Sequence, residues 1–255
     1  MFFTNMTFIG VDPSAGEKPI VYAAIDHERR LLALGGGSLD EVLAFAAGQR
    51  QAVLAVCAPR GPNLGLMRQA EVRKDLDPSP SPGRWENSRL AEYLLRKHNI
   101  HIPLTPNIDH DCPNWMRQGF ELFRRLLKIG YQLFPRPGAE RLCLEVYPHA
   151  AFSVLLGLIP FGKNTLEGRL QRQLVLFEQK VEVPDPMRFF EEITRHRLLK
   201  GVLPADILYT PGELDALVAA YTSLLAASQP EKILMLGDPE EGQVVIPAVE
   251  LKPHY

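Results

Sequence analysis

Residues 38–57 read SLDEVLAFAAGQRQAVLAVC, and this stretch decides the fold class. Ser38 and Glu41 have the spacing of a capping box, which predicts that a helix begins there. The run AVLAVC (52–57) is continuously apolar, as is typical of a strand that is covered on both faces. A strand, a helix and another strand in succession predict a right-handed crossover between two parallel strands.

Short apolar runs on either side of this stretch extend the predicted sheet. TFIGV (7–11), PIVYAAID (19–26) and RLLALGG (30–36) are separated by tight turns, which predicts an antiparallel meander. Further strands are expected at RLCLEV (141–146), KILMLG (232–237) and QVVIPAVEL (243–251). Helical periodicity predicts helices at 84–100, 114–134, 166–180, 186–199 and 212–227. The pattern predicts a three-layer fold of the α/β or α+β class.

The bulk composition is that of an ordinary globular protein. Hydrophobic residues make up 46% and charged residues 23% of 255 residues, and the net charge of −2 argues against a polycation that coats nucleic acid. We expect a single domain over residues 1–255, with residues 60–140 as an elaboration between two core strands. Three cysteines without a CxxC pair argue against a disulfide framework or a structural zinc site. With no signal peptide and no apolar run long enough to span a membrane, the expected location is the cytoplasm.

Three acidic residues stand among apolar neighbours. Asp12 closes the first strand, Glu145 lies inside LCLEVYP, and Asp215 lies inside ELDALVAAY. Buried charges are costly unless they are paired or bind a cation, although each acid taken alone is also compatible with a strand end, a turn or a helix start. Sites in open sheets form at the carboxyl ends of strands where the strand order reverses. Carboxylates gathered there suit Mg²⁺ or Mn²⁺.

Seven segments, taken in order, resemble the DUF429 family. They are GVDPSAGEKPIVYAAID, AVLAVCAPRG, SRLAEYLLRKHNI, LEVYPHAAFSVLLG, KNTLEGRLQRQ, LDALVAAYTS and GDPEEGQVVIP. Members of that family are described as predicted nucleases with a ribonuclease H-like (RNase H-like) fold. The resemblance implies a mixed five-stranded sheet in the order 3-2-1-4-5, with a helical insertion between the fourth and fifth strands.

The resemblance also implies which residues form the site. Asp12, Glu145 and Asp215 are the expected metal ligands and catalytic carboxylates. The family usually has an Asp at the end of the fourth strand, where this sequence has Cys57. A thiolate is a soft ligand that matches Mg²⁺ poorly. A nucleophilic role for Cys57 would need a nearby base, such as His149 or His27, and a lowered pKa.

Several basic residues are secondary candidates. His149, in YPHA, is expected either to move a proton beside the metal or to cap backbone groups at a helix start. Lys163 and Arg169, in GKNTLEGR, and Arg89, in SRLAE, are candidates for contacts with a substrate phosphate. For each of these three, an exposed surface position is the competing interpretation.

The leading functional hypothesis is a divalent-metal-dependent nuclease that hydrolyses phosphodiester bonds, with Mg²⁺ or Mn²⁺ as cofactor, a nucleic acid as partner and no association with membranes. The alternative is a catalytically weakened RNase H-like protein that acts as a nucleic-acid-binding or scaffold module, because Cys57 replaces an expected Asp. A third hypothesis is phosphotransfer, which would use the segment Asp12–Gly16 as a phosphate loop. The oligomeric state is left open by the sequence.

Overall fold

The computed structural model describes residues 6–13, 18–76, 79–81, 83 and 85–255. Residues Ser14–Gly16 of the candidate phosphate loop lie outside this described part. The strands are β1 (Thr7–Asp12), β2 (Ile20–Ile25), β3 (Leu31–Gly37), β4 (Ala52–Val56), β5 (Gln132–Leu133), β6 (Arg141–Glu145), β7 (Leu234–Asp238) and β8 (Gly242–Ile246).

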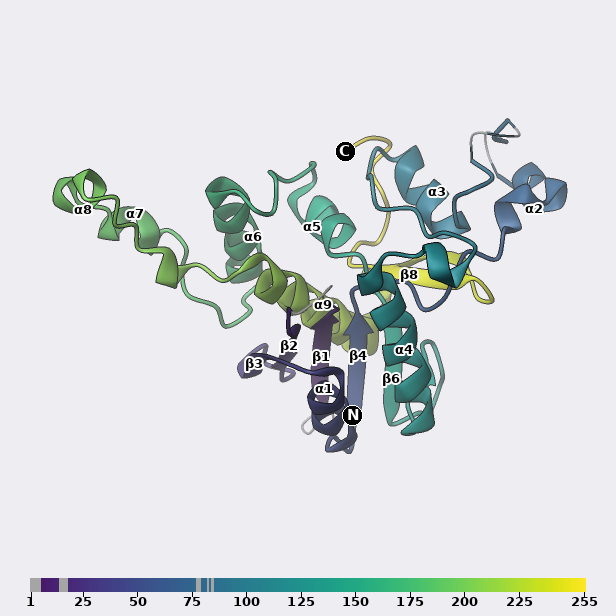
Figure 1. Cartoon of the computed structure of the whole chain (residues 1–255), viewed down its shortest axis with the longest axis horizontal. Coiled ribbons are helices and arrows are strands. Elements are labelled where there is room, and N and C mark those ends of the chain that lie inside the picture. Colours follow the sequence, from purple (N-terminus) through teal and green to yellow (C-terminus); the bar gives the residue numbers. More distant parts are fainter. Residues whose placement is uncertain (1–5, 14–17, 77–78, 82, 84) are drawn as a thin grey trace.

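The α-helices cover both faces of one central sheet (Figure 1). They are α1 (Leu39–Ala47), α2 (Ala70–Lys74), α3 (Leu90–Lys97), α4 (Asn114–Lys128), α5 (Pro148–Leu156), α6 (Leu166–Glu178), α7 (Arg188–Glu192), α8 (Arg195–Leu199) and α9 (Pro211–Ser228). Short 3₁₀ turns are η1 (Leu66–Arg68), η2 (Asp109–Asp111), η3 (Ala205–Ile207) and η4 (Pro230–Lys232). No helix among the described residues is both long and apolar enough to cross a bilayer.

The sheet is mixed and runs in the order β3-β2-β1-β4-β6-β8-β7. The short strand β5 pairs in parallel with the first half of β6. The meander β1–β2–β3 is antiparallel, whereas β1, β4 and β6 are parallel, as the helix between β3 and β4 predicts. The predicted count of five strands is too low, because the described residues form eight. The last two strands fold into the hairpin β7–β8, which joins β6 through a single aligned pair, Glu145 and Val244.

Three predicted helices differ from the observed ones. The helix expected over 114–134 ends at Lys128, because Gly130 has a positive φ of 95°, and residues 132–133 form β5 instead. The helix expected over 84–100 begins only at Leu90, because Arg89 has an extended backbone and acts as its N-cap. The helix expected over 186–199 is two short helices, α7 and α8. The backbone of Ile193 is extended and ends α7. Thr194 is the N-cap of α8, and its side chain accepts a hydrogen bond from the backbone N–H of Arg197.

Helix α9 is the central helix of the fold. It is apolar nearly all round, its residues Leu214–Ala226 are all buried, and it lies across β1, β2 and β4. Its closest approach is at Gly10 of β1, where an added Cβ would lie 1.9 Å from the carbonyl oxygen of Ala216 and 2.5 Å from the nitrogen of Ala220. Only a glycine permits this spacing between strand and helix.

We expect Gly10→Ala to lower the free energy of unfolding by about 3 kcal/mol, because α9 must move away from β1 to admit the methyl group. The measurement is the midpoint of urea unfolding. Gly61→Ala is the matched control, because no atom lies within 4 Å of the Cβ it would gain. Equal midpoints for the two variants would contradict the close packing.

Candidate active site

The alternation of side chains along the strands sorts the predicted acids onto two faces of the sheet. Val11, Val56 and Glu145 are neighbours in the registers of β1, β4 and β6, so their side chains share one face. Asp12 and Cys57 each follow by one residue and therefore point to the opposite face, where α9 lies. Glu145 thus lies across the sheet from the other two predicted carboxylates.

The carboxyl groups of Asp12 and Asp215 interact at the carboxyl end of β1, and the buried region around them is here called the crevice. The N-terminus of α9 is set by Thr210 and Glu213, which form a capping box, and by Pro211 in the first turn. The next residue, Gly212, lies against Asp12: a Cβ there would be 3.4 Å from an Asp12 carboxylate oxygen. Asp215 follows one turn further along α9 and is 3% exposed.

The electrostatics of this crevice disfavour two bare carboxylates. Burial, together with the negative charge of Asp215, raises the pKa of Asp12 from 3.8 to about 7, against a smaller opposing effect of Lys163. Burial also raises the pKa of Asp215, although Lys163 opposes this rise. The two carboxyl groups therefore carry less than their full negative charge at neutral pH unless a cation joins them.

Lys163 supplies one positive charge to the crevice. Its Nζ lies 2.7 Å from Oδ2 of Asp215, and its side chain is 51% exposed. Burial opposes the ammonium ion, but the ion pair with Asp215 outweighs it and raises the pKa of Lys163. The loop that carries Lys163 is held by Arg172, a further basic residue of the GKNTLEGRLQR segment, whose guanidinium donates to the carbonyl oxygens of Phe161 and Gly168.

Cys57 lies beside this pair but is neither ionised nor exposed. It is 4% exposed, and its Sγ donates a hydrogen bond to the backbone carbonyl oxygen of Asp215 over 3.5 Å. Burial, and then the charges of Asp12 and Asp215, raise the pKa of its thiol well above the usual value. A nucleophile or a metal ligand needs the thiolate, so this environment argues against both roles.

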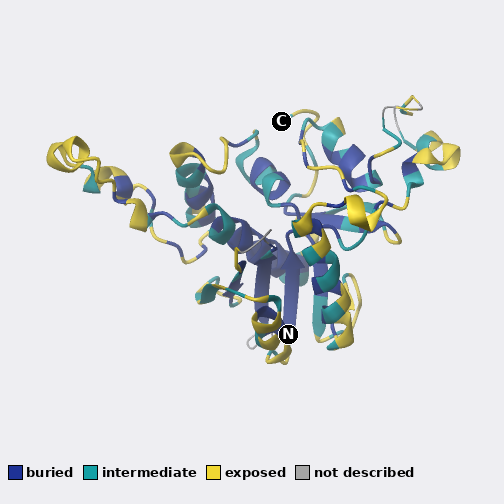
Figure 2. Ribbon diagram, in the orientation of Figure 1, coloured by how far each residue is buried: buried dark blue, intermediate teal, exposed yellow. Residues whose placement is uncertain are grey.

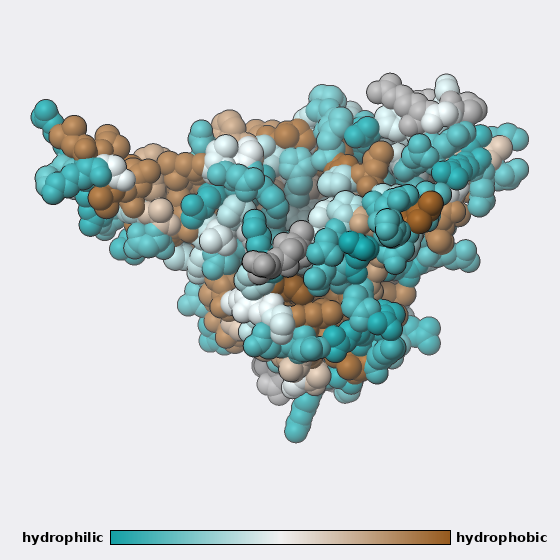
Figure 3. All heavy atoms as spheres, viewed as in Figure 1, coloured by the Kyte–Doolittle hydropathy of each residue, from teal (hydrophilic) through white to brown (hydrophobic). Residues whose placement is uncertain are grey.

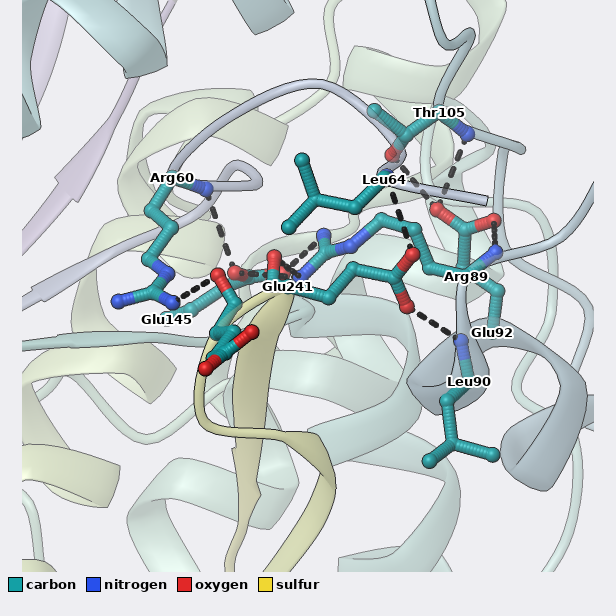
Figure 4. Close-up of polar contacts among 9 residues, drawn as sticks. Arg60, Leu64, Arg89, Leu90, Glu92, Thr105, Glu145 and Glu241 are labelled. Atoms are coloured by element: carbon teal, nitrogen blue, oxygen red, sulfur yellow. Dashed lines mark hydrogen bonds and ion pairs between the residues drawn. The ribbon is translucent and has the colours of Figure 1, made fainter. Parts of the chain in front are cut away.

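Glu145 belongs to a separate buried cluster (Figure 4). Nη1 and Nη2 of Arg89 donate to its two carboxylate oxygens over 2.6 Å and 3.0 Å, and the backbone N–H of Arg60 donates to Oε2 over 3.2 Å. Arg89 is completely buried. The prediction that Arg89 contacts a substrate phosphate is therefore wrong in this structure: the guanidinium is enclosed, and its charge is matched by Glu145.

The cluster joins three distant segments of the chain. The carboxylate of Glu241, in the β7–β8 turn, accepts from the backbone N–H groups of Leu64 and Leu90, and its carbonyl oxygen accepts from Arg89 (Figure 4). Glu92 accepts from the backbone and hydroxyl of Thr105. Removing one partner of such a buried pair costs about 3–5 kcal/mol, so these residues hold the insertion onto the sheet. Glu92 and Glu241 occur in the motifs SRLAE and GDPEEG, which was the available sequence signal.

The two remaining candidates, His149 and Arg169, differ in what holds their side chains. His149 is the second residue of α5, and its pKa is lowered by burial and then by the positive charges of Arg172, His101 and Lys163. It is therefore neutral near pH 7. The guanidinium of Arg169 donates to the carbonyl oxygens of Leu208 and Tyr209, so it tethers the segment that leads into α9.

Only part of the predicted ligand set fits a metal ion. Within the described ranges, no group of three His, Cys, Asp or Glu side chains is arranged to hold one. Asp12 and Asp215 present hard oxygen donors to one crevice, which suits Mg²⁺ or Mn²⁺, since Mg²⁺ is commonly bound through one or two carboxylates with several waters. Glu145 does not fit, because it faces the other side of the sheet and pairs with Arg89.

The sequence model of one family, described as "Protein of unknown function (DUF429)", matches residues 10–241 of the chain. No curated protein and no solved structure gave a match. The matched range contains both charged centres: the crevice of Asp12 and Asp215, and the cluster of Arg89 and Glu145.

The raised pKa of Asp12 has a consequence for stability. A carboxyl whose folded-state pKa exceeds its unfolded value destabilises the fold once it is ionised. The raised pKa of Asp12 therefore costs nothing below about pH 4; its cost grows between about pH 4 and pH 7 and levels off above that.

We expect Asp12→Asn to abolish much of this pH dependence in chelator-treated protein. The variant should match the wild type near pH 4 and exceed its free energy of unfolding by about 1–3 kcal/mol near pH 8. Urea unfolding over this pH range measures the difference. A gap between the two proteins that does not widen with pH would contradict the assignment of Asp12 as the strained carboxyl.

Proposed function

The chain belongs to the DUF429 family, and we propose that it is a divalent-metal-dependent nuclease whose working carboxylates are Asp12 and Asp215. This narrows the ligand set that the resemblance implied, since Glu145 is assigned to the buried ion pair with Arg89. The same crevice includes Lys163 and, near it, His149.

The strand order supports the RNase H-like part of the proposal. The path β3-β2-β1-β4-β6 follows the order 3-2-1-4-5 that the resemblance implies, with β6 as the fifth strand. On this interpretation, β5 and the hairpin β7–β8 are additions to the core, and the segment between β4 and β6 is the helical insertion. The crevice lies at the carboxyl ends of β1 and β4, beside the antiparallel meander, where sites in open sheets form.

The observation that carries the proposal is the enclosed pair of carboxyl groups at this position. Burial raises the pKa of both Asp12 and Asp215, and the charge of Asp215 raises the pKa of Asp12 further; one lysine does not cancel the effect. A purely structural carboxylate would have been expected to have a buried cationic partner, as Glu145 does in its ion pair with Arg89. An excess of buried oxygen donors is the arrangement that a hard divalent cation relieves.

Each residue has a definite task in this proposal. Asp12 and Asp215 would hold the cation, which would supply Lewis acidity for activating a water and for stabilising charge on a phosphodiester. Lys163 keeps Asp215 in place, and because its side chain is half exposed, its ammonium group can also donate to a phosphate oxygen. His149 is neutral near pH 7 and can accept the proton that the attacking water loses.

Cys57 supports the alternative function, a weakened nuclease that acts as a binding or scaffold module. Its protonated thiol occupies a position where a further carboxylate would complete the site, and it donates to the backbone of Asp215 instead. Phosphotransfer has less support, because the backbone N–H of Arg60, just after β4, is occupied by Glu145.

We expect Mn²⁺ to stabilise the protein and to stimulate cleavage of DNA or RNA. Asp12→Asn and Asp215→Asn should lose both effects, with cleavage falling at least about hundredfold, whereas Asp40→Asn, on the surface, should retain them. The measurements are the unfolding midpoint with and without Mn²⁺, and cleavage of single-stranded, double-stranded and junction substrates. Activity that survives Asp12→Asn would overturn the residue assignment.

The Cys57→Asp variant distinguishes the two proposed functions, a fully active nuclease and a weakened binding or scaffold module. In chelator the variant should be less stable than the wild type, because a third carboxyl group enters the buried crevice. If the natural site is weakened, Mn²⁺ should restore this loss and raise cleavage above the wild-type rate. Cys143→Asp is the control: Cys143 is buried on the opposite face of the sheet, so Mn²⁺ should not rescue it. No response to Mn²⁺ in Cys57→Asp would remove the basis of the alternative.

A further inference from the structure

The segment 185–206, here called the arm, projects from the body of the molecule beyond α6 (Figure 1). It contains α7 and α8 and ends within the turn η3. Its root is held by the side-chain amide of Gln173, which donates to the carbonyl oxygens of Pro184 and Ile207 on the two sides of the arm. Phe189, near the root, is buried, but the outer part is exposed on all sides (Figure 2).

The outer part of the arm exposes several large apolar side chains that no other part of the described chain covers. Every residue from 194 to 203 is exposed. Leu199 is 80% exposed, the highest value among the large hydrophobic residues that lie on the described surface. Apolar side chains gather on the arm in the space-filling view (Figure 3). The exposed large ones are Met187, Phe190, Leu198, Leu199, Val202 and Leu203.

Helices of five residues are too short to be stable without packing, and α7 and α8 are both of this length. A concentrated apolar surface of this kind marks an interaction site in a soluble protein. The arm spans roughly twenty residues, which is comparable to the ~20–30 residues that each partner contributes to a standard interface. The arm is thus large enough to carry a specific contact.

The charges on the arm indicate what covers it. α7 begins with Arg188 but ends with Glu191 and Glu192, whereas α8 and its cap are basic, with Arg195, Arg197 and Lys200. Within one arm, Glu192 pairs with Arg197 over 3.2 Å, and both side chains remain nearly half exposed. Two copies of the arm placed antiparallel would bring the acidic α7 of each against the basic α8 of the other. A two-fold contact requires this kind of self-complementary surface. An anionic membrane or a nucleic acid would match α8 but would be repelled by the glutamates of α7.

We propose that the arm binds the arm of a second copy of this chain, in an antiparallel two-fold contact with Leu198 and Leu199 at its centre. The contact is independent of the nuclease proposal, because no arm residue belongs to the crevice of Asp12 and Asp215. The two arms would form the apolar interface of a dimer, with the rest of each subunit on either side of it.

Sedimentation of the full-length protein tests the proposal directly. The wild type should be a dimer at micromolar concentration, and Leu199→Glu should weaken self-association by about hundredfold. Val249→Glu is the control, because Val249 is 68% exposed and lies outside the arm. A monomeric wild type overturns the proposal, as does a dimer that Leu199→Glu leaves intact.

A charge exchange tests the antiparallel arrangement. Glu191→Lys with Glu192→Lys, in one variant, and Arg195→Glu with Arg197→Glu, in another, should each impair self-association. Mixing the two variants should restore dimers, because each altered helix then faces an opposite charge. The internal pair of Glu192 and Arg197 is exposed, so its loss leaves the fold intact. Failure of the mixture to form dimers overturns the two-fold contact.

Sedimentation with vesicles containing phosphatidylserine distinguishes a lipid partner. The wild type should remain in solution at physiological salt. Binding to the vesicles that Leu199→Glu abolishes would assign the arm to a membrane surface and overturn the proposed dimer.

Discussion

The contact between α9 and β1 at Gly10 is the constraint on which the rest of the structure depends. Because the strand has no side chain there, the helix axis comes close enough for backbone atoms of Ala216 and Ala220 to occupy the space of a Cβ. This distance brings Asp215 of α9 against Asp12 of β1. The same apolar helix also buries one face of the sheet, so the packing that stabilises the fold also creates the charged crevice.

The sheet separates two charged centres that differ in how their carboxylates are paired. On one face, Glu145 is paired with the two terminal nitrogens of Arg89, and Glu241 accepts further hydrogen bonds, while burial raises the pKa of the neighbouring Glu92 to about 7. On the other face, Asp12 and Asp215 share one half-exposed lysine and have raised pKa values. The first centre holds the insertion to the core. The second retains strain, and strained electrostatics of this kind are typical of functional sites.

The long segment between β4 and β6 is therefore part of the architecture. Arg60, Arg89 and Glu92 come from this segment, while Glu145 comes from the sheet and Glu241 from the β7–β8 hairpin. Any change in this cluster would loosen the carboxyl ends of β4 and β6, and Cys57 lies directly after β4. The arm, in contrast, is joined to the body mainly through Gln173 and Phe189 and can form contacts without disturbing the crevice.

Local patterns in the sequence determined the secondary structure and much of the topology. The capping box at Ser38 and the apolar run 52–57 predicted the parallel crossover, and apolar neighbours singled out Asp12, Asp215 and Glu145. The sequence also placed Cys57 beside Asp12. Only the tertiary structure decided which acids meet, because strand register sets the face of each side chain and a shift of one residue reverses it. Glu145 is the neighbour of Val56 and not of Cys57, so it binds Arg89, a partner 56 positions away in the chain, and leaves Asp12 to Asp215.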